Sequence, residues 1–420
     1  MNILAIETSC DETAISIIST REKSFPDQKT EKSSGSKASV ESRRSQVKIL
    51  SNIVSSQVKL HAKWGGVVPN LAKREHEKNL IPILKKALKE SKMFNPSSKD
   101  SPWNIFQGES LEEILRKEPD LLKQFSKEIP KLKIPKIDAI AVTYGPGLEP
   151  ALWVGVNFAK ALSSVWEKPL IPINHMEGHI LSSLLDQKEF PVSNFQFPAI
   201  ALLVSGGHTE LVLMKKWLDY KIIGETRDDA VGEAFDKVAR MLGLGYPGGP
   251  LVAKLASLGG EASKWDIKLP RPMMNSGDFD FSFSGLKTAV LYKIKEINDS
   301  KKSAVKKNDS LSKSIKSKIC YEFQEATVDV LVSKTIKAVK KYKAKTIIIG
   351  GGVASNARLR ERLKESSAEN SINLILPPKE LATDNAVMIA MAAYLRILGA
   401  KNPAIKTLSK LKADGNLRLK

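Results

Sequence analysis

The sequence predicts an α/β protein with two related lobes. Near its start, two short apolar segments at 2–6 and 14–18 flank a turn rich in hydroxyl and carboxylate groups, and two more at 198–204 and 210–214 flank a glycine turn. Short apolar runs bounded by turn residues are typical of buried strands. Because this design occurs twice, we expect two lobes of one plan. A chain of 420 residues, 42% of them hydrophobic, can supply a core for both.

The first lobe is expected to span residues 1–172. Two polar insertions interrupt it: a Ser/Lys/Arg-rich segment at 21–48, predicted to be mobile, and a second segment at 93–136. The expected elements are strands at 2–6 and 14–18, an amphipathic segment at 46–59, helices at 71–92 and 110–127, a strand at 137–143 and a helix at 151–166. Pro82 is expected to kink the first of these helices or to begin a second segment.

The second lobe is expected to span residues 173–384 and to carry the metal and nucleotide residues, with a basic loop at 293–318. Residues 385–420 are predicted to form a helix that returns to the first lobe, followed by a basic tail. The expected elements of the second lobe are a helix from 175, strands at 198–204 and 210–214, a helix at 225–243, helices after 250 and within 278–290, a helix at 319–341, a strand at 345–351 and a helix from 357.

The chain is strongly basic, with a net charge of +20 and a pI near 9.6. Three lysine-rich stretches, 21–48, 292–318 and 401–420, supply +4, +6 and +5 of that charge. Such a surface favours a polyanionic partner, RNA before membrane, through phosphate contacts. Solubilising loops are the alternative, because no aromatic residues interleave these lysines as a base-stacking surface requires.

The cysteines and the hydropathy indicate a cytoplasmic protein. The two cysteines, Cys10 and Cys320, exclude a disulfide framework and suit a reducing compartment. No apolar run reaches the ~18 residues of a membrane span. The N-terminus lacks the charged region and cleavage site of a signal peptide, so we expect no membrane association.

The stretch 174–179 (NHMEGH) holds two of the five histidines. Residues four apart lie about 40° apart around a helix, so His175 and His179 can bind one ion, and Asn174 is a candidate N-cap. Glu177 falls on the far side of the helix, unlike the glutamate of the protease motif H-E-x-x-H, so we expect a metal site without that base. Taken alone, two ordinary helix histidines are the commoner explanation.

An ion would need at least one further ligand. Asp384 precedes the last apolar helix and is the candidate, although its position equally suits an N-cap. Two histidines and a carboxylate with open positions suit Zn²⁺ or Fe²⁺. His76, in a charged helical stretch, is expected to be solvated.

Three turns at strand ends, 9–13, 204–209 and 350–356, carry glycine or small polar residues. Glycine lets a ligand approach the backbone, and a following helix N-terminus favours an anion. There is no G-x-x-x-x-G-K-[ST] sequence and no G-x-G-x-x-G after the first strand, which excludes a P-loop. Together the three turns suit a nucleotide held in a cleft between the lobes.

Eight segments in one order resemble the TsaD family (Gcp, Kae-type), the tRNA N6-adenosine threonylcarbamoyltransferases of the actin-like/sugar-kinase (ASKHA) superfold. They are AIETSCDETA, GPGLEPALWVG, NHMEGH, ALLVSGGHTEL, GEAFDKVARMLGLGYPGGP, DFSFSGLKTAV, GGGVASN and TDNAVMIA. They lie within roughly 1–20 and 137–395, outside the first two insertions. The resemblance implies an α/β fold of two related lobes with a ligand cleft between them.

The resemblance also implies the reaction. A threonylcarbamoyl group would pass from threonylcarbamoyl-adenylate to the N6 amine of the adenosine 3′ of the anticodon in tRNAs reading ANN codons, releasing AMP. One divalent ion per subunit, Fe²⁺ or Zn²⁺, would be held by His175, His179 and Asp384. The implied substrate contacts are Leu203, Val204, Ser205, Gly206, Gly207, Asp236, Gly249 and Asn356. A TsaB-type paralogue and a TsaE-type ATPase are the expected protein partners.

A general base would assist the weakly nucleophilic amine. Asp11 on the first turn is the candidate and Glu12 the reserve, because both carboxylates lie in a turn able to face a ligand. Glu149 and Asn157 replace smaller residues common in the family, on the helix through which bacterial members pair with TsaB.

Three other functions fit less well. A metalloprotease, an older label for this family, would need the motif glutamate in another place. A small-molecule kinase of the same superfold has no use for two histidines four apart. A catalytically silent scaffold would lack the histidines and the aspartate of TDN.

Overall fold

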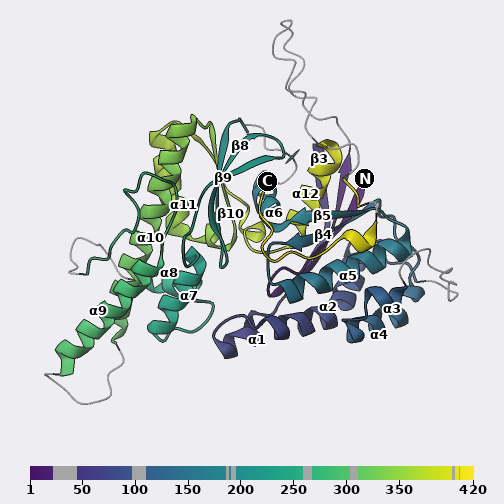
Figure 1. Cartoon of the computed structure of the whole chain (residues 1–420), viewed down its shortest axis with the longest axis horizontal. Coiled ribbons are helices and arrows are strands. Elements are labelled where there is room, and N and C mark those ends of the chain that lie inside the picture. Colours follow the sequence, from purple (N-terminus) through teal and green to yellow (C-terminus); the bar gives the residue numbers. More distant parts are fainter. Residues whose placement is uncertain are drawn as a thin grey trace, which may run out of the picture. The chain divides into compact units, whose positions relative to one another are not determined.

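The computed structural model describes residues 1–21, 45–96, 110–185, 189–190, 195–258, 267–302, 311–399, 403–405 and 407–420 (Figure 1). The chain divides into two compact units: residues 1–57, 67–195 and 384–419 form the first, and 58–66, 196–383 and 420 the second. The predicted lobe boundary between residues 172 and 173 is therefore wrong. The first unit also contains segment 173–195, which carries the histidine motif, and Asp384. The helix after Asp384 returns to this unit, as expected.

The first unit is built on a mixed sheet in the order β5-β4-β1-β2-β3-β6. Its strands are β1 (Asn2–Glu7), β2 (Glu12–Arg21), β3 (Ser45–Ser56), β4 (Ala139–Gly145), β5 (Leu170–Asn174) and β6 (Glu189–Phe190). β1, β2 and β3 form an antiparallel meander, whereas β4 pairs parallel with β1 and β5 parallel with β4. The N-terminal strand pair is thus confirmed, and the amphipathic segment at 46–59 is mostly strand β3.

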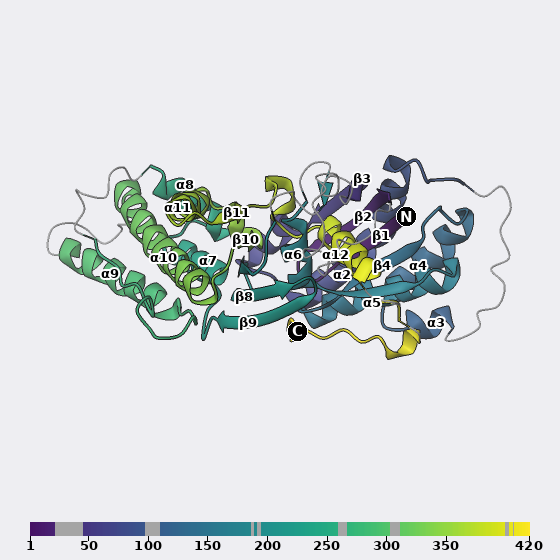
Figure 2. The ribbon, with the colours of Figure 1, turned by 90° about the horizontal axis from the view of Figure 1, so that it is seen from above.

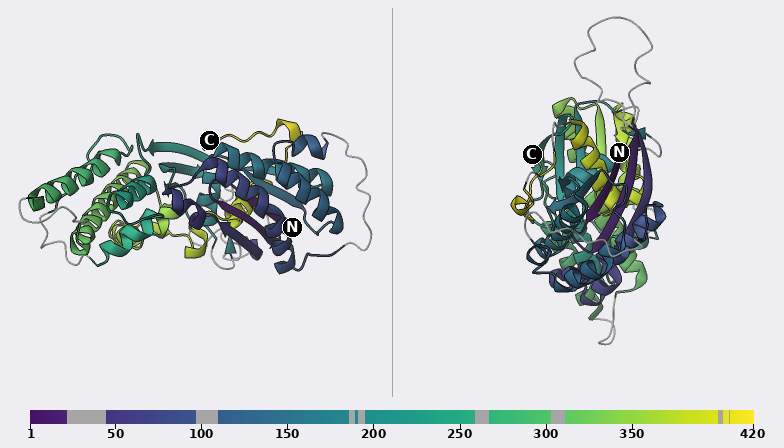
Figure 3. Two further views of the ribbon diagram at one scale, coloured as in Figure 1. Left: turned by 90° about the horizontal axis from the view of Figure 1, so that it is seen from below. Right: turned by 90° about the vertical axis from the view of Figure 1, so that its right-hand side faces the viewer.

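Helices cover both faces of this sheet (Figures 2 and 3). They are α2 (Pro69–Glu90), α3 (Leu111–Ile114), α4 (Pro119–Glu128), α5 (Glu149–Trp166), α6 (His175–Ser182) and α12 (Ala386–Gly399), with 3-10 turns η3 (Ile129–Lys131) and η7 (Leu408–Lys410). Leu4 and Ile6 of β1 share a buried cluster with residues of α2 and α5, while α12 packs on β1 and β2 and against α6. Helix α2 continues through Pro82.

The described part of the insertion at 93–136, which is 93–96 and 110–136, packs on the helices of the first unit. Leu121 and Phe125 of α4 belong to the buried cluster beneath α2 and α5. Asn157 of α5, predicted to lie on a helix surface, is buried and donates a hydrogen bond from Nδ2 to Glu118 Oε2 at 3.0 Å. The part of α5 around this residue is therefore covered by the chain's own insertion.

The second unit has a five-stranded sheet in the order β11-β10-β7-β8-β9. Its strands are β7 (Ala199–Val204), β8 (Thr209–Lys216), β9 (Asp219–Glu225), β10 (Thr346–Gly350) and β11 (Asn373–Ile375). β7, β8 and β9 form an antiparallel meander, and β10 pairs parallel with β7 and with β11. This is the plan of β1 to β5 repeated. It confirms the predicted α/β class with two related lobes.

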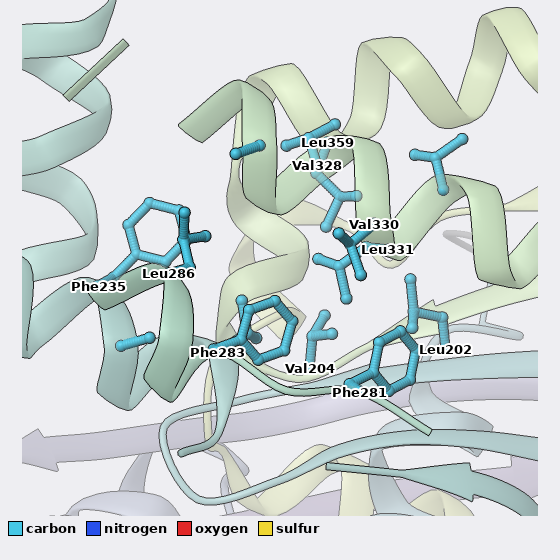
Figure 4. Packing of buried hydrophobic residues seen from close by; sticks show 14 of the residues in the cluster. Leu202, Val204, Phe235, Phe281, Phe283, Leu286, Val328, Val330, Leu331 and Leu359 are labelled. Atoms are coloured by element: carbon cyan, nitrogen blue, oxygen red, sulfur yellow. The ribbon is translucent and has the colours of Figure 1, made fainter. Parts of the chain in front are cut away.

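The helices of the second unit enclose an aromatic-rich core. They are α1 (Val58–His61), α7 (Val231–Met241), α8 (Gly248–Ala256), α9 (Ser284–Lys302), α10 (Lys313–Tyr342) and α11 (Ala357–Glu369), with 3-10 turns η2 (Ala62–Trp64), η5 (Gly352–Ser355) and η6 (Lys379–Leu381). Figure 4 shows Phe235, Phe281 and Phe283 packed between β7 and the helices. Burying such rings contributes roughly 1.5–3 kcal/mol each, and this core holds the end of β7 in place.

Several expectations need correction. The lysine-rich segment 293–318 is not simply a loop, because α9 continues to Lys302 and α10 begins at Lys313. Strands β5, β9 and β11 were not predicted, since each is short and only its pairing in the sheet identifies it. The predicted mobile segment at 21–48 lies mostly outside the described residues, as do 97–109 and 303–310. Among the helices described, none is long and apolar enough to cross a membrane.

Candidate active site

Helix α6 starts directly after β5, and Asn174 forms its N-cap. Asn174 Oδ1 accepts hydrogen bonds from the backbone N–H groups of Met176 at 2.8 Å and Glu177 at 3.3 Å. This is the cap that the sequence predicts. It sets the start of the helix and thereby places His175 and His179 on one face, with ring centroids 4.6 Å apart.

Three side chains meet at this face of α6. The Nε2 atoms of His175 and His179 are 3.1 Å apart. Asp384 Oδ1 lies 3.6 Å from His175 Nε2 and 3.1 Å from His179 Nε2. The two histidines are buried and Asp384 is half-buried. The structure thus brings together the three residues proposed as metal ligands from the sequence.

A second layer of side chains holds His175 through its other nitrogen. Glu7 Oε2 and Ser9 Oγ each lie 3.1 Å from His175 Nδ1, and Thr143 Oγ1 donates to Glu7 Oε2. Because a carboxylate only accepts hydrogen bonds, Nδ1 carries a proton and Nε2 is the atom presented to the cluster.

The charges around His175 shift the pKa values of both partners. Burial opposes the charged imidazole, but the carboxylates of Glu7 and Asp384 outweigh it and raise the pKa of His175 to about 9. Burial likewise opposes the charge of Glu7, and the neighbouring His175 outweighs it, so the pKa of Glu7 is lowered. Without an ion, His175 is therefore protonated at neutral pH and paired with two carboxylates.

The donor set fits a divalent cation. The Nε2 atoms of His175 and His179 are 3.1 Å apart, so a single proton can lie between them. A cation in that place would instead bind the lone pairs of both nitrogens and the carboxylate of Asp384. His179 Nδ1 is buried with no hydrogen-bond partner in the described part of the chain, so this side chain acts through Nε2. Two imidazoles and a carboxylate, with a hydrogen-bonded second layer, are typical of Zn²⁺ and Fe²⁺ sites that keep positions open for substrate.

Glu177 belongs to the histidine motif but not to the ligand cluster. Its carboxylate is fully buried, and Oε2 forms an ion pair with Arg396 Nε at 2.8 Å, near the end of α12. The sequence correctly places this side chain away from the ligands. A glutamate neutralised by arginine is unsuited to the role of general base.

The turn between β1 and β2 carries the two candidate bases. Burial, with the charges of Asp384 and Asp11, raises the pKa of Glu12 well above its usual range. Ser56 Oγ donates to Glu12 Oε1 at 3.2 Å. Asp11 is buried, and its Oδ2 has no hydrogen-bond partner among the described residues. The Asp384 carboxylate, a candidate metal ligand, therefore acts electrostatically on Glu12, which in turn interacts with Asp11.

His76 is buried, and the prediction that it is solvated is wrong. It shares the inner face of α2 with Ala72 and Leu80, which the charged residues around it obscure in the sequence. His76 Nε2 donates to the carbonyl of Cys10 at 2.9 Å, and Nδ1 accepts from Thr13 Oγ1 at 2.8 Å. It is no metal ligand; it fixes the turn that carries the candidate bases.

The second unit has a different kind of site, at the carboxyl ends of β7 and β10. After β7, Ser205 Oγ accepts hydrogen bonds from the N–H groups of Gly207 at 3.3 Å and His208 at 3.0 Å. Gly232 in the first turn of α7 donates to the carbonyl of Ser205 at 3.1 Å. The carboxyl ends of parallel strands are where open α/β sheets bind ligands.

Open space lies beside the glycines of this site. A Cβ atom built on any of four glycines would meet nothing within 4 Å: Gly206, Gly207, Gly249 and Gly352. A ligand can therefore approach the backbone closely at these positions. Leu203 and Val204, by contrast, are fully buried, so neither of these two sequence-predicted contacts presents surface to a ligand in this structure.

Asp236 and Asn356 order the surrounding segments. Asp236 Oδ1 accepts from the N–H of Gly248 at 2.7 Å and so fixes the start of α8. Asn356 Oδ1 caps α11 by accepting from Leu359 N at 3.0 Å, while its Nδ2 donates to Gln324 Oε1 at 3.0 Å. Of the sequence-predicted substrate residues, Ser205, Gly206 and Gly207 follow β7 directly, Asn356 follows η5 after β10, and Asp236 and Gly249 lie on α7 and α8.

Comparison with known proteins decides the family. The family model described as "TsaD: tRNA N6-adenosine threonylcarbamoyltransferase" matches residues 48–95 and 117–391. A Persephonella marina protein named tRNA N6-adenosine threonylcarbamoyltransferase is 42% identical over 399 residues, covering 94% of this chain and 90% of the relative. A Thermosipho africanus protein of the same name is 40% identical over 419 residues and 100% of both chains. The chain belongs to the TsaD family.

The similarity to solved structures of other proteins is low. Full-length HypF has a TM-score of 0.45 and 15% identity, over 68% of this chain and 51% of that chain. The Acidaminococcus fermentans (R)-2-hydroxyglutaryl-CoA dehydratase component A has a TM-score of 0.44 and 10% identity, over 95% and 100%.

The match to the family model is not continuous along the chain. The family model does not match 96–116, which falls within the second predicted insertion. The predicted resemblance to TsaD is confirmed, and the comparisons do not support the protease or kinase readings. The sequence did not predict that Glu7, Ser9 and Thr143 lie behind His175. Glu7 and Ser9 belong to the segment AIETSCDETA. No pattern in that segment indicates that they contact a helix 166 or more residues away.

Proposed function

We propose that this protein transfers the threonylcarbamoyl group of threonylcarbamoyl-adenylate to the N6 amine of the adenosine 3′ of the anticodon in tRNAs reading ANN codons. Family membership supports the reaction, and the observation that carries the site is the convergence of His175, His179 and Asp384, whose facing nitrogen and oxygen atoms lie 3.1–3.6 Å apart. The amine nitrogen bonds to the carbamoyl carbon, the bond from that carbon to the phosphate oxygen breaks, AMP leaves, and the amine loses a proton.

The chain's own residues have distinct tasks in this proposal. His175, His179 and Asp384 would hold one Zn²⁺ or Fe²⁺ ion, which when bound polarises a carbonyl oxygen. Glu7 and Ser9 orient His175 for that role. The glycine turns of the second unit accept the nucleotide through backbone N–H groups. Asp11 is the proposed proton acceptor, with Glu12 as the alternative.

The decisive experiment follows labelled threonylcarbamoyl from preformed adenylate into an unmodified ANN-decoding tRNA transcript. Wild type is compared with a His175→Ala/His179→Ala double variant, each with and without a TsaB-type paralogue and a TsaE-type ATPase, the proposed partners. Label in tRNA from wild type and none from the folded double variant is expected. Absence of transfer from folded, metal-loaded wild type in every mixture would refute the proposal.

The proton acceptor needs a separate test. Asp11→Asn and Glu12→Gln are assayed beside Asp120→Asn, an exposed carboxylate of α4. The variant that removes the base should lower kcat by about 10²–10⁴-fold, the usual worth of general base catalysis, and leave metal content unchanged. Normal turnover in both turn variants would remove the base from the mechanism.

We also propose that the protein is cytoplasmic, and cell fractionation would test this location.

A further inference from the structure

Trp64 is an exposed aromatic side chain on a short 3-10 turn. Of its surface, 69% is accessible, more than for any other exposed large apolar side chain of the described residues. Tryptophan is usually well buried in folded proteins. A single exposed apolar residue is common on protein surfaces, so the setting of Trp64 decides whether it has a role.

The loop that presents Trp64 is anchored. Gly65 adopts a positive φ of 67°, and its N–H donates to the carbonyl of Ala62 at 3.2 Å. The guanidinium of Arg240 donates from Nη2 to the carbonyl of Gly65. Arg240 stands in the last turn of α7, the helix whose first turn contacts the Ser205 turn. The ring is therefore displayed on a fixed element of the unit that carries the glycine-lined site.

The charged side chains near this loop in the sequence are all basic. Lys59 and Lys63 are both exposed and lie within five residues of Trp64. In the sequence, the 33 residues from Ser42 to Arg74 contain seven lysines and arginines and no acid, although 46 of the 420 residues are acidic. An average segment of this length would hold about four acids. This stretch is free of the negative charge that would repel a polyanion.

We propose that Trp64 is a stacking platform for an unpaired base of the tRNA substrate, with Lys59 and Lys63 contacting the flanking phosphates. The inference rests on the proposed function, in which tRNA is the acceptor. Single-stranded RNA is recognised by aromatic rings that stack on bases beside cations that track the backbone. The lysine-rich stretches predicted from sequence lack such an arrangement of interleaved rings. This loop, outside those stretches, supplies it.

The direct test is binding of an unmodified ANN-decoding tRNA transcript to the full-length chain. Trp64→Ala should weaken the Kd about tenfold, because stacking is worth roughly 5- to 160-fold per base, and Trp64→Phe should restore most of the affinity. Leu258→Ala is the matched control, since Leu258 is 60% exposed in the same unit. It should bind as wild type does. Equal Kd values for Trp64→Ala and wild type would overturn the proposal.

Kinetics and salt dependence separate stacking from charge. Trp64→Ala should raise KM for tRNA about tenfold and leave KM for the adenylate unchanged. Lys59→Ala/Lys63→Ala should flatten the slope of log Kd against log salt by about one to two, because about 0.7 of a counterion is released per phosphate contact. An unchanged slope would remove the lysines from the proposal.

The outcomes distinguish this inference from the proposed function. Wild type that binds and modifies tRNA, with Trp64→Ala behaving identically, refutes the stacking platform and leaves the transferase intact. Wild type that neither binds nor modifies tRNA refutes both. If Trp64→Ala instead weakens only the binding of a TsaB-type or TsaE-type protein, the exposed ring is a protein contact and the proposal is wrong.

Discussion

The two units share one sheet plan, yet the turns at equivalent places hold different chemistry. In the first unit, the turn after β1 carries Ser9, Asp11 and Glu12 beside buried histidines. In the second, the turn after β7 carries Ser205, Gly206 and Gly207, with open space at both glycines. Within each sheet, the common topology places the carboxyl ends of the parallel strands at one edge. The residues of the turn at that edge then determine which ligand can bind.

The difference agrees with the ligand proposed for each site. A divalent ion is small, and three or four donor atoms on buried, fixed side chains satisfy it. A nucleotide is large and carries its own charge, so it needs room and backbone N–H groups more than side chains. Substitutions should therefore act through lost donor atoms in the first unit and through filled space in the second.

The largest effect is expected from removal of a ligand. Asp384→Ala should weaken metal affinity about 1,000-fold, because each ligand carries several of the roughly 10–16 kcal/mol of a structural zinc site. Transfer activity should fall with metal content, while adenylate binding by the second unit stays within twofold. Mass spectrometry measures the metal content, and titration with the adenylate measures its binding. Retention of the ion would mean that Asp384 is no ligand.

The second prediction contrasts two adjacent glycines. Gly351 has a φ of 90°, and a Cβ there would lie 2.3 Å from the carbonyl oxygen of Val204, whereas Gly352 has open space. Gly351→Ala should lower the free energy of unfolding by about 3 kcal/mol through strain and overlap. Gly352→Ala should fold normally and weaken adenylate binding. Urea denaturation and titration distinguish them; equal stability of the two variants would contradict the assignment.

The third prediction concerns the ion pair between Glu177 of α6 and Arg396 of α12. Arg396→Met leaves the buried Glu177 carboxylate without its arginine and should cost about 2 kcal/mol, less than for a fully buried pair because Arg396 is 37% exposed. Adding Glu177→Gln should recover part of that loss. Thermal unfolding of the two single variants and the double variant measures the coupling, and additive losses would show that the pair does not interact.

The smallest effect, counted per unit of pH, is expected in the pH dependence of metal binding. His175, with a pKa of about 9 in the metal-free protein, must lose a proton before Nε2 can bind an ion. Below that pKa the proton competes, so affinity should fall up to tenfold, about 1.4 kcal/mol, for each unit of decreasing pH between 8 and 6. Chelator competition measures the slope, with release of about one proton per ion. A flat profile would contradict protonation of His175.

Folding stability of the metal-free protein should move in the opposite direction with pH. The pKa of His175 is raised above its unfolded value near 6.5, so the ion pairs with Glu7 and Asp384 stabilise the fold fully below that pH. This contribution is lost as pH rises through about 9. A bound ion should remove the trend, because it takes the place of the proton.

The sequence by itself determined the local elements and the ligand candidates. The strands around the first turn and the capped helix at His175 follow from short-range periodicity and from one N-cap at Asn174. The spacing of His175 and His179 predicts a shared face because the helix repeat is known. The order of the eight matching segments identified the family, and this resemblance supported Asp384, already a candidate from its place before the last helix.

Only the tertiary structure decided which distant groups surround them. Glu177 meets Arg396 across 219 residues, and Glu7 meets His175 across 168. His76 appears solvated in sequence because its neighbours are charged, and it is buried because α2 turns one face to the sheet. Periodicity describes which side of an element is apolar. It does not say which other element covers that side. The residues that hold His175 from behind, the burial of His76 and the pKa of His175 all depend on that packing.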